Sequence, residues 1–256
     1  MSAPMLEVQG VSKRFGGVQA LSEVGLRIEP GQIYGLIGPN GAGKTTFFNV
    51  ITGMYTADAG RFELAGEVYQ PTAVHQVAQA GIARTFQNIR LFAEMSALEN
   101  VKVGQHVRTH AGLWAALWRT AAYWAEEKAI TQRAHEWLSY VGIGHLANHK
   151  AGTLSYGDQR RLEMARALAT EPRLLALDEP AAGMNATEKT QLRELIDRIR
   201  HDGRTVLLIE HDVKLVMGLC DAVTVLDHGR TIAQGSPSQV QSHPAVIEAY
   251  LGTGGH

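Results

Sequence analysis

The sequence holds a single cysteine, Cys220, among its 256 residues. One thiol excludes a disulfide framework within the chain, is typical of a reducing compartment and gives no support to a structural zinc site. We expect Cys220 to be a small buried core residue.

An excess of charge and long apolar runs are missing as well. The chain has 24 Lys and Arg against 25 Asp and Glu, a formal net charge of -1, so its bulk charge does not call for nucleic acid. No charge-free apolar stretch is long enough to span a bilayer, and residues 1–7 lack the basic and apolar segments of a signal peptide. We therefore expect a soluble or peripheral protein with no nucleic-acid partner.

Glycine is plentiful, and residues 38–46 fit the pattern G-x-x-x-x-G-K-[ST] between an apolar run at 33–37 and a helix-favouring run at 47–51. The stretch consists of Gly38, Pro39, Asn40, Gly41, Ala42, Gly43, Lys44, Thr45 and Thr46. Glycines let successive N–H groups point at a polyphosphate beside the positive end of a helix. We expect Lys44 to reach the β- and γ-phosphates and Thr45 to hold Mg²⁺. A glycine turn with a chance lysine is the alternative, which the flanking strand and helix disfavour.

The remaining pattern predicts an α/β fold. Buried strands at 33–37, 174–177, 205–209 and 222–226 alternate with helices, which is typical of a mostly parallel sheet covered on both faces. Short strands at 6–8 and 24–28 predict an antiparallel layer, with Phe15 in a turn over 13–17, where it could stack on a base or simply pack. Further strands are expected at 61–64 and 82–86, helices at 72–80, at 160–169 and from Asn185 to about 200, and short helices at 237–251.

Between residues 96 and 152 the strand signals vanish and helical spacing takes over. Ser96 and Glu99 have the spacing of a capping box at its start. All four tryptophans lie here, and we expect them to form the core of a helical subdomain. The alternative is a helix that lies on a membrane surface or binds a partner protein.

Polar residues follow several of the predicted strands at the carboxyl edge where ligands bind in such sheets. Asp178 is expected to assist Mg²⁺, and Glu179 to orient or deprotonate an attacking water. His211 can reach the same edge and donate a hydrogen bond to the γ-phosphate, although alone it would be a core histidine. Gln87, at the end of its strand, can ligate Mg²⁺ or hold the water.

Taken together, these motifs resemble, in type and order and over nearly the whole chain, the ATP-binding subunits of ABC transporters. The matching segments are the Walker A loop at 38–46, the Q-loop at Gln87, the signature motif at 154–159, the Walker B strand at 174–179, the D-loop at 181–185 and the switch residue His211. Phe15 stands where that family has its adenine-stacking aromatic. The resemblance implies a head-to-tail dimer, in which the signature of one subunit contacts the ATP of the other. The residues implied to do so are Ser155, Tyr156, Gly157, Asp158 and Gln159. Tyr156 and Asp158 replace the glycine and glutamine of the common form, and Asn185 replaces an aspartate.

The resemblance also implies a division of the chain and a set of partners. It implies one ABC ATPase domain, in which 1–95 and 153–236 form the P-loop core with its antiparallel layer, 96–152 the helical subdomain continuing into the signature helix 153–170, and 237–256 a tail. The segments at 84–92, 154–163, 177–185 and 209–217 are most similar to the branched-chain amino acid importer subunit with the longer helical insert. Such importers contain two different ATPase subunits, two different membrane permeases and a periplasmic binding protein, and their ATPases lie peripherally on the cytoplasmic face of the cell membrane. For this chain we expect a second ATPase subunit, identical or different, as a partner.

Three other readings stay open on the sequence. The chain could serve another ABC transporter, for urea, amides or exported lipid. It could be a soluble ABC ATPase acting on nucleic acid or ribosomes, although those usually carry two cores or long basic coiled coils. A phosphoryl-transferring kinase shares the phosphate loop but has no use for Ser155, Gly157 and His211.

Overall fold

The computed structural model describes residues 3–87, 89–105 and 121–251. By its internal contacts the chain divides into two compact units, Met1–Arg84 with Arg173–His256, here called the sheet unit, and Thr85–Pro172, here called the helical unit. We describe each unit by itself.

The sheet unit contains a six-stranded sheet in the order β10-β9-β3-β8-β7-β6, parallel except for β10. Its strands are β3 (Ile33–Ile37), β6 (Ile82–Arg84), β7 (Leu174–Asp178), β8 (Thr205–Ile209), β9 (Ala222–Asp227) and β10 (Arg230–Gly235). Every residue of β3, β7 and β8 is buried, which explains their unbroken apolar runs. The predicted parallel core is confirmed. β10 was not predicted, because only Ala233 in it is buried and its other residues carry no apolar alternation.

A second sheet in the same unit is antiparallel, with the order β2-β1-β4-β5. Its strands are β1 (Leu6–Phe15), β2 (Val18–Ile28), β4 (Ala59–Leu64) and β5 (Glu67–Val68). The predicted antiparallel layer is confirmed, but β1 and β2 are longer than the sequence indicated. Register shifts interrupt their pairing between Val8 and Arg14, and such bulges break the alternation on which a strand prediction depends. Phe15 therefore ends β1 instead of lying in a turn.

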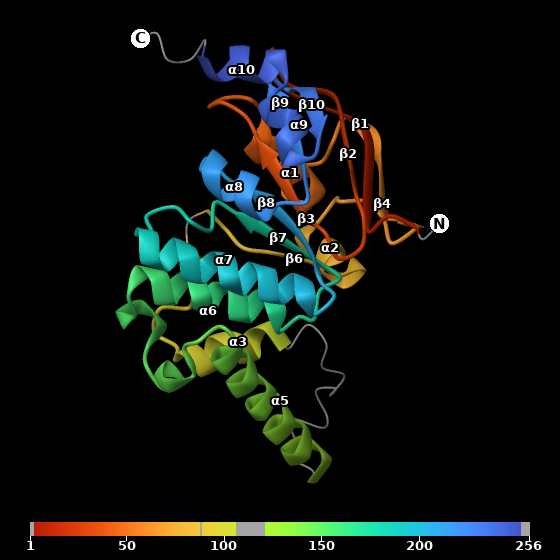
Figure 1. Cartoon of the computed structure of the whole chain (residues 1–256). Coiled ribbons are helices and arrows are strands. Elements are labelled where there is room, and N and C mark those ends of the chain that lie inside the picture. The colour runs from red at the N-terminus through yellow and green to blue at the C-terminus, as the bar shows by residue number, and fades with distance from the viewer. Residues whose placement is uncertain (1–2, 88, 106–120, 252–256) are drawn as a thin grey trace. The chain divides into compact units, whose positions relative to one another are not determined.

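Helices of the sheet unit are α1 (Lys44–Ile51), α2 (Val74–Ala80), α7 (Ala186–His201), α8 (Val213–Leu219), α9 (Pro237–Gln241) and α10 (Pro244–Leu251). The last two pack beside β9 and β10, as Figure 1 shows, and confirm the predicted short helices of the tail. The helix predicted from Asn185 is confirmed as α7, and Asn185 and Glu188 form its capping box, with reciprocal hydrogen bonds of 2.9 and 3.0 Å.

The helical unit is built from α3 (Ala97–Gln105), α5 (Ala121–Tyr140) and α6 (Tyr156–Leu168), with α3 in contact with both others (Figure 1). A side chain at Gly104 would collide with the Arg166 carbonyl, so α3 and α6 approach closely there. Ser96 and Glu99 form the predicted capping box of α3.

The core of the helical unit is aliphatic. Its fully buried side chains include Val101, Leu138, Ile143, Leu162 and Leu168. Trp124 is 55% exposed and Trp137 half-buried, so the prediction that tryptophans form this core is wrong for Trp124; Trp114 and Trp118 lie outside the described residues. Helical spacing of aromatics does not distinguish a buried stripe from an exposed one.

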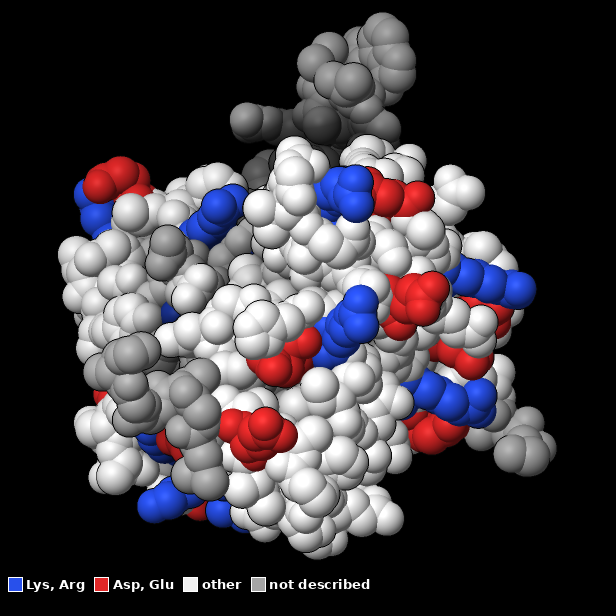
Figure 2. Space-filling view, turned by 90° about the horizontal axis from the view of Figure 1, so that it is seen from above, with Lys and Arg blue, Asp and Glu red and all other residues white. Residues whose placement is uncertain are grey.

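Charges on the face drawn in Figure 2 are mixed, with red and blue side chains interspersed among uncharged ones. Such a face has no large field of one sign that would attract a polyanion. Among the residues that the model describes, no helix is both long and apolar enough to cross a bilayer.

Candidate functional site

The phosphate-loop sequence joins the buried strand β3 to helix α1 in the sheet unit. Gly38, Gly41 and Gly43 have φ angles of 152°, 78° and 97°, which only glycine adopts readily. A side chain at Gly38 would also collide with the Leu226 carbonyl. Gly43 is the N-cap of α1 and has no side chain, and the first turn has no acid. The first-turn amides can therefore receive an anion.

Lys44 is buried with 5% of its surface exposed, and its ammonium donates hydrogen bonds to the carbonyl oxygens of Gly38 and Pro39 at 2.7 and 2.9 Å. Burial lowers the pKa of Lys44, and the charge of Glu179 opposes that shift. Two backbone carbonyls of the loop thus hold the ammonium in place. It can exchange these acceptors for phosphate oxygens at little cost, because phosphates are stronger acceptors.

Sheet order brings the other candidates of this unit to the same edge. β8 lies between β3 and β7, so the same edge holds the loop after β3, Asp178 at the end of β7 with Glu179 directly after it, and His211 two residues after β8. Nε2 of His211 lies against Oε1 of Glu179, whose side chain is 10% exposed against 46% for the histidine. Glu179 has a φ of 47°, rare for a residue with a side chain, and its N–H donates to the Ile209 carbonyl at 3.0 Å. The backbone therefore aims Glu179 at this edge.

Glu210 supports this edge and was not singled out from the sequence. It is buried, with 3% exposed, and its carboxylate accepts from the backbone N–H of Ala181 at 2.7 Å and of His211 at 3.2 Å. Burial raises the pKa of Glu210, while these amides work against the rise. Glu210 thus links Ala181, at the start of the D-loop, to the backbone of the switch residue His211. The sequence pattern that could have identified Glu210 is an acid directly after a buried strand.

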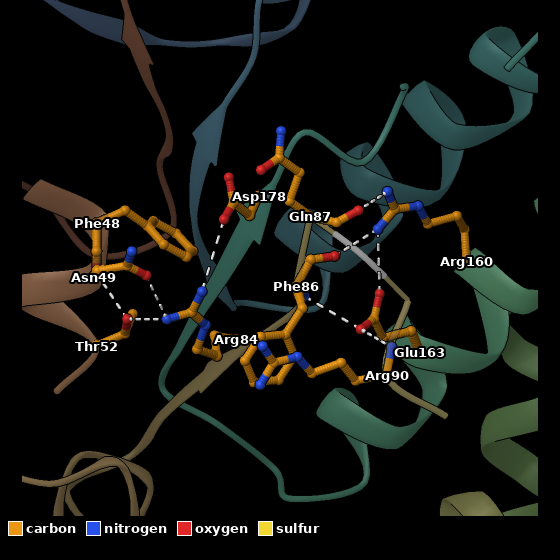
Figure 3. Close-up of polar contacts among 10 residues, drawn as sticks. All are labelled: Phe48, Asn49, Thr52, Arg84, Phe86, Gln87, Arg90, Arg160, Glu163 and Asp178. Carbon is orange, nitrogen blue, oxygen red and sulfur yellow. Dashed lines mark hydrogen bonds and ion pairs between the residues drawn. The ribbon is translucent and has the colours of Figure 1, made fainter. Parts of the chain in front are cut away.

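Arg84, also missed, lies beside Asp178 in the sheet unit (Figure 3). Its guanidinium donates to Asn49 at 3.0 Å and to Thr52 at 2.6 Å, both from the α1 region, and lies 3.7 Å from Oδ2 of Asp178. The side chains of Arg84 and Asp178 are 8% and 3% exposed, and the guanidinium sits 4.8 Å from the centre of the Phe48 ring. A buried cation therefore stands next to the carboxylate expected to assist Mg²⁺. The sequence pattern that could have identified Arg84 is an arginine within a predicted buried strand.

Phe15 is 43% exposed and makes an edge contact with Tyr55 at 5.2 Å between ring centres. The Lys13 ammonium lies over the ring, 5.3 Å from its centre. Stacking on adenine stays a prediction.

In the helical unit, the signature residues form the start of α6. The Ser155 hydroxyl caps the helix by accepting from the Asp158 N–H at 3.2 Å and donates to the Asp158 carboxylate at 2.7 Å. Gln159 donates to the Leu154 carbonyl at 2.9 Å, Gly157 is buried, and Tyr156 is 45% exposed. The hydroxyl expected to face a phosphate is therefore engaged by a neighbouring acid, a consequence of Asp158 in this position.

Gln87 is exposed in the segment after β6. The strand predicted over 82–86 ends at Arg84, because the backbone of Phe86 bonds to side chains of α6 instead of to a strand. Among the described residues, no group of three or more His, Cys, Asp or Glu could hold a metal alone.

Comparison with known proteins agrees with this geometry. The family model described as "ABC transporter" matches residues 21–182, which is more than half of the chain. The chain belongs to the ABC transporter family. Family members with this cassette are ATP-binding, ATP-hydrolysing subunits. A second family model, "Branched-chain amino acid ATP-binding cassette transporter", matches residues 230–256 of this cassette.

Relatives of the cassette extend over its whole length. It is 48% identical to the high-affinity branched-chain amino acid transport ATP-binding protein BraF of Pseudomonas aeruginosa, over 98% of this chain and 99% of the relative. It is 46% identical to the corresponding protein LivG of Escherichia coli over the same shares. A solved structure, the ADP conformation of an ATP-binding cassette of an ABC transporter, superposes with a TM-score of 0.85 at 31% identity, covering 98% of this chain and 100% of that one. The expected ABC ATPase fold is thereby confirmed.

Proposed function

We propose that this cassette hydrolyses ATP to power import of branched-chain or other hydrophobic amino acids. Support comes from BraF and LivG, which are branched-chain amino acid transport proteins by name and match end to end. The match of residues 230–256 to the corresponding C-terminal model points the same way.

The observation that carries the catalytic part of this proposal is the pairing of Glu179 with His211 from neighbouring parallel strands. In the proposed site Glu179 orients or deprotonates the attacking water, and His211 donates a hydrogen bond to the γ-phosphate. The buried carboxylate of Glu210 holds the N–H of His211 and so helps to fix the histidine.

The nucleotide is proposed to lie on the loop of residues 38–46, with Lys44 on the β- and γ-phosphates and Phe15 against adenine. Thr45, Asp178 and Gln87 would hold Mg²⁺, which neutralises charge on the phosphates when bound. The hydroxyl, the carboxylate and the amide are oxygen donors of the kind that Mg²⁺ prefers.

Assembly is part of the proposal. A second ATPase subunit, identical or different, would receive the residues 155–159 of this chain on its ATP, since the start of α6 presents helix amides and the positive end of the helix dipole. Two membrane permeases and a periplasmic amino-acid-binding protein would complete the complex on the cytoplasmic face of the membrane. In this arrangement 1–95 with 153–236 serves as the core, 96–152 as the helical subdomain and 237–256 as the tail.

The catalytic assignment is tested with Glu179→Gln in the purified chain. We expect ATP turnover to fall by roughly 10² or more, the contribution typical of a positioned base, while ATP binding persists and an ATP-bound dimer accumulates. Glu194→Gln, an exposed acid on α7, is the matched control and should keep wild-type turnover. Sustained hydrolysis by Glu179→Gln would remove Glu179 from this role.

Lys44→Ala tests the phosphate assignment separately. It should weaken ATP binding by roughly tenfold or more, since it removes a charge-assisted contact to phosphate. Wild-type affinity in calorimetry would contradict the placement of Lys44.

The transported substrate is tested by purifying the chain with its partners from native membranes. Co-purification of two permeases and a binding protein that takes up leucine, isoleucine or valine is the expected result. A binding protein for urea or amides, or capture of ribosomes or nucleic acid, would overturn the substrate part of the proposal while leaving the ATPase intact.

A further inference from the structure

Three side chains of α6 in the helical unit, Tyr156, Arg160 and Glu163, form one connected group with the chain around Gln87; we call these three the α6 clamp. The Arg160 guanidinium donates to the carbonyl oxygen of Phe86 at 2.6 Å and also to that of Gln87. The Glu163 carboxylate accepts from the backbone N–H of Phe86 at 3.2 Å, and both side chains are drawn in Figure 3.

Both charged members of the clamp are buried. Arg160 and Glu163 have 3% and 1% of their side chains exposed, and their nearest charged atoms are 3.4 Å apart. Burial raises the pKa of Glu163, while the amides of Phe86 and Arg90 and the charge of Arg160 favour its ionised form. These two buried charged side chains form hydrogen bonds with one short backbone segment, and they thereby fix the path of that segment.

Tyr156 extends the clamp into the signature motif. Its hydroxyl accepts a hydrogen bond from Arg160 at 2.9 Å, and the guanidinium lies 5.3 Å from the centre of its ring. The common family form has glycine in this position, which offers neither acceptor nor ring. The tyrosine thus supplies the fork of Arg160 with an acceptor one helical turn away.

We propose that Arg160 and Glu163 are positioning residues that set the place of Gln87, and that Tyr156 couples this position to the signature motif. The inference rests on the proposed function, because it assumes that Gln87 acts on Mg²⁺ or the water. It adds that a displacement of the signature motif also displaces the Gln87 segment, since the Arg160 guanidinium forms hydrogen bonds with both. Arg160 and Glu163 touch none of the reacting atoms in this proposal.

A double-mutant cycle separates positioning from plain stability. Arg160→Lys keeps the charge but loses the fork, and we expect it to lower kcat roughly tenfold, as misplacement of a catalytic group does, with the KM for ATP nearly unchanged. Gln87→Ala should lower kcat by itself. In the double variant the two losses should not multiply, because the arginine acts through the glutamine.

Arg133→Lys, an exposed arginine of α5 in the same unit, is the matched control and should leave kcat and KM unchanged. Multiplying losses in the double variant, or wild-type kcat for Arg160→Lys, would overturn the inference. Should wild-type protein hydrolyse no ATP at all, the proposed function fails instead, so the two failures are distinguishable.

Tyr156→Phe provides a variant that removes one hydroxyl and keeps the ring, in case Arg160→Lys does not fold. We expect kcat to fall by up to about tenfold, the lower end of what one hydrogen bond to a charged group contributes, with an unchanged melting temperature, and no further fall when Gln87→Ala is already present. An equal fall in the Gln87→Ala background would show that Tyr156 acts elsewhere and would refute the coupling.

Discussion

Replacing Arg84 with methionine is the most direct test of how the nucleotide edge is held together. The change removes hydrogen bonds of 2.6 and 3.0 Å to Thr52 and Asn49 and a cation 3.7 Å from the Asp178 carboxylate, all in a region less than a tenth exposed at Arg84 and Asp178. A hydrogen bond to a charged group contributes about 1.5–3 kcal/mol, and breaking a buried ion pair costs about 3–5 kcal/mol. These figures describe one side chain and do not add. We therefore expect Arg84→Met to lower the free energy of unfolding by about 3–5 kcal/mol.

The assay is urea unfolding without nucleotide, because bound ATP would itself stabilise the fold. Arg61→Met is the matched control: its ion pair with Glu63 is on the surface, with the arginine 64% exposed, and should contribute no more than about 1 kcal/mol. In an Asp178→Asn background the cost of Arg84→Met should shrink by about 1–3 kcal/mol, since the buried carboxylate charge is gone.

Two results would refute this reasoning. One is a loss for Arg84→Met as small as that of the Arg61→Met control. The other is the same loss with and without the Asp178→Asn change, which would mean that the two charges do not interact.

Two further outcomes follow from the site and the core. Asp158→Gln should free the Ser155 hydroxyl and remove a negative charge from the start of α6. Introduced into the Glu179→Gln variant, it should therefore tighten the ATP-bound dimer by up to about tenfold in sedimentation experiments. An unchanged or weaker dimer would contradict this. Burial raises the pKa of Cys220 to about 12 from 9.0, so the native thiol should resist an aromatic disulfide reagent at pH 8 and react only on unfolding. Because the folded pKa is raised, the stability from the neutral thiol is present below pH 9 and is lost as pH rises from 9 to about 12. Rapid labelling of the native protein would show that Cys220 is accessible.

Much of the site could be read from the chain because its chemistry is local. A strand of five buried residues followed by glycines and Lys44 has few other uses, and acids at the carboxyl end of β7 must lie at the carboxyl edge of a parallel sheet. Helix starts at Ser96 and Asn185 were predictable for the same reason, since a capping box spans only four residues. The ends of β1 and β2 were not, because bulges break the alternation.

By itself, the sequence determined which residues end strands, which turns need glycine and which helices are capped, since these depend on neighbours along the chain. Only the tertiary structure decided that β8 lies between β3 and β7, which brings His211 to Glu179. It likewise decided that buried charges such as Arg84 and Arg160 have carboxylates and carbonyls as partners. Periodicity tells whether a position is buried, but a charge buried in the interior is stabilised by groups from distant segments, and their approach is set by sheet order and helix packing.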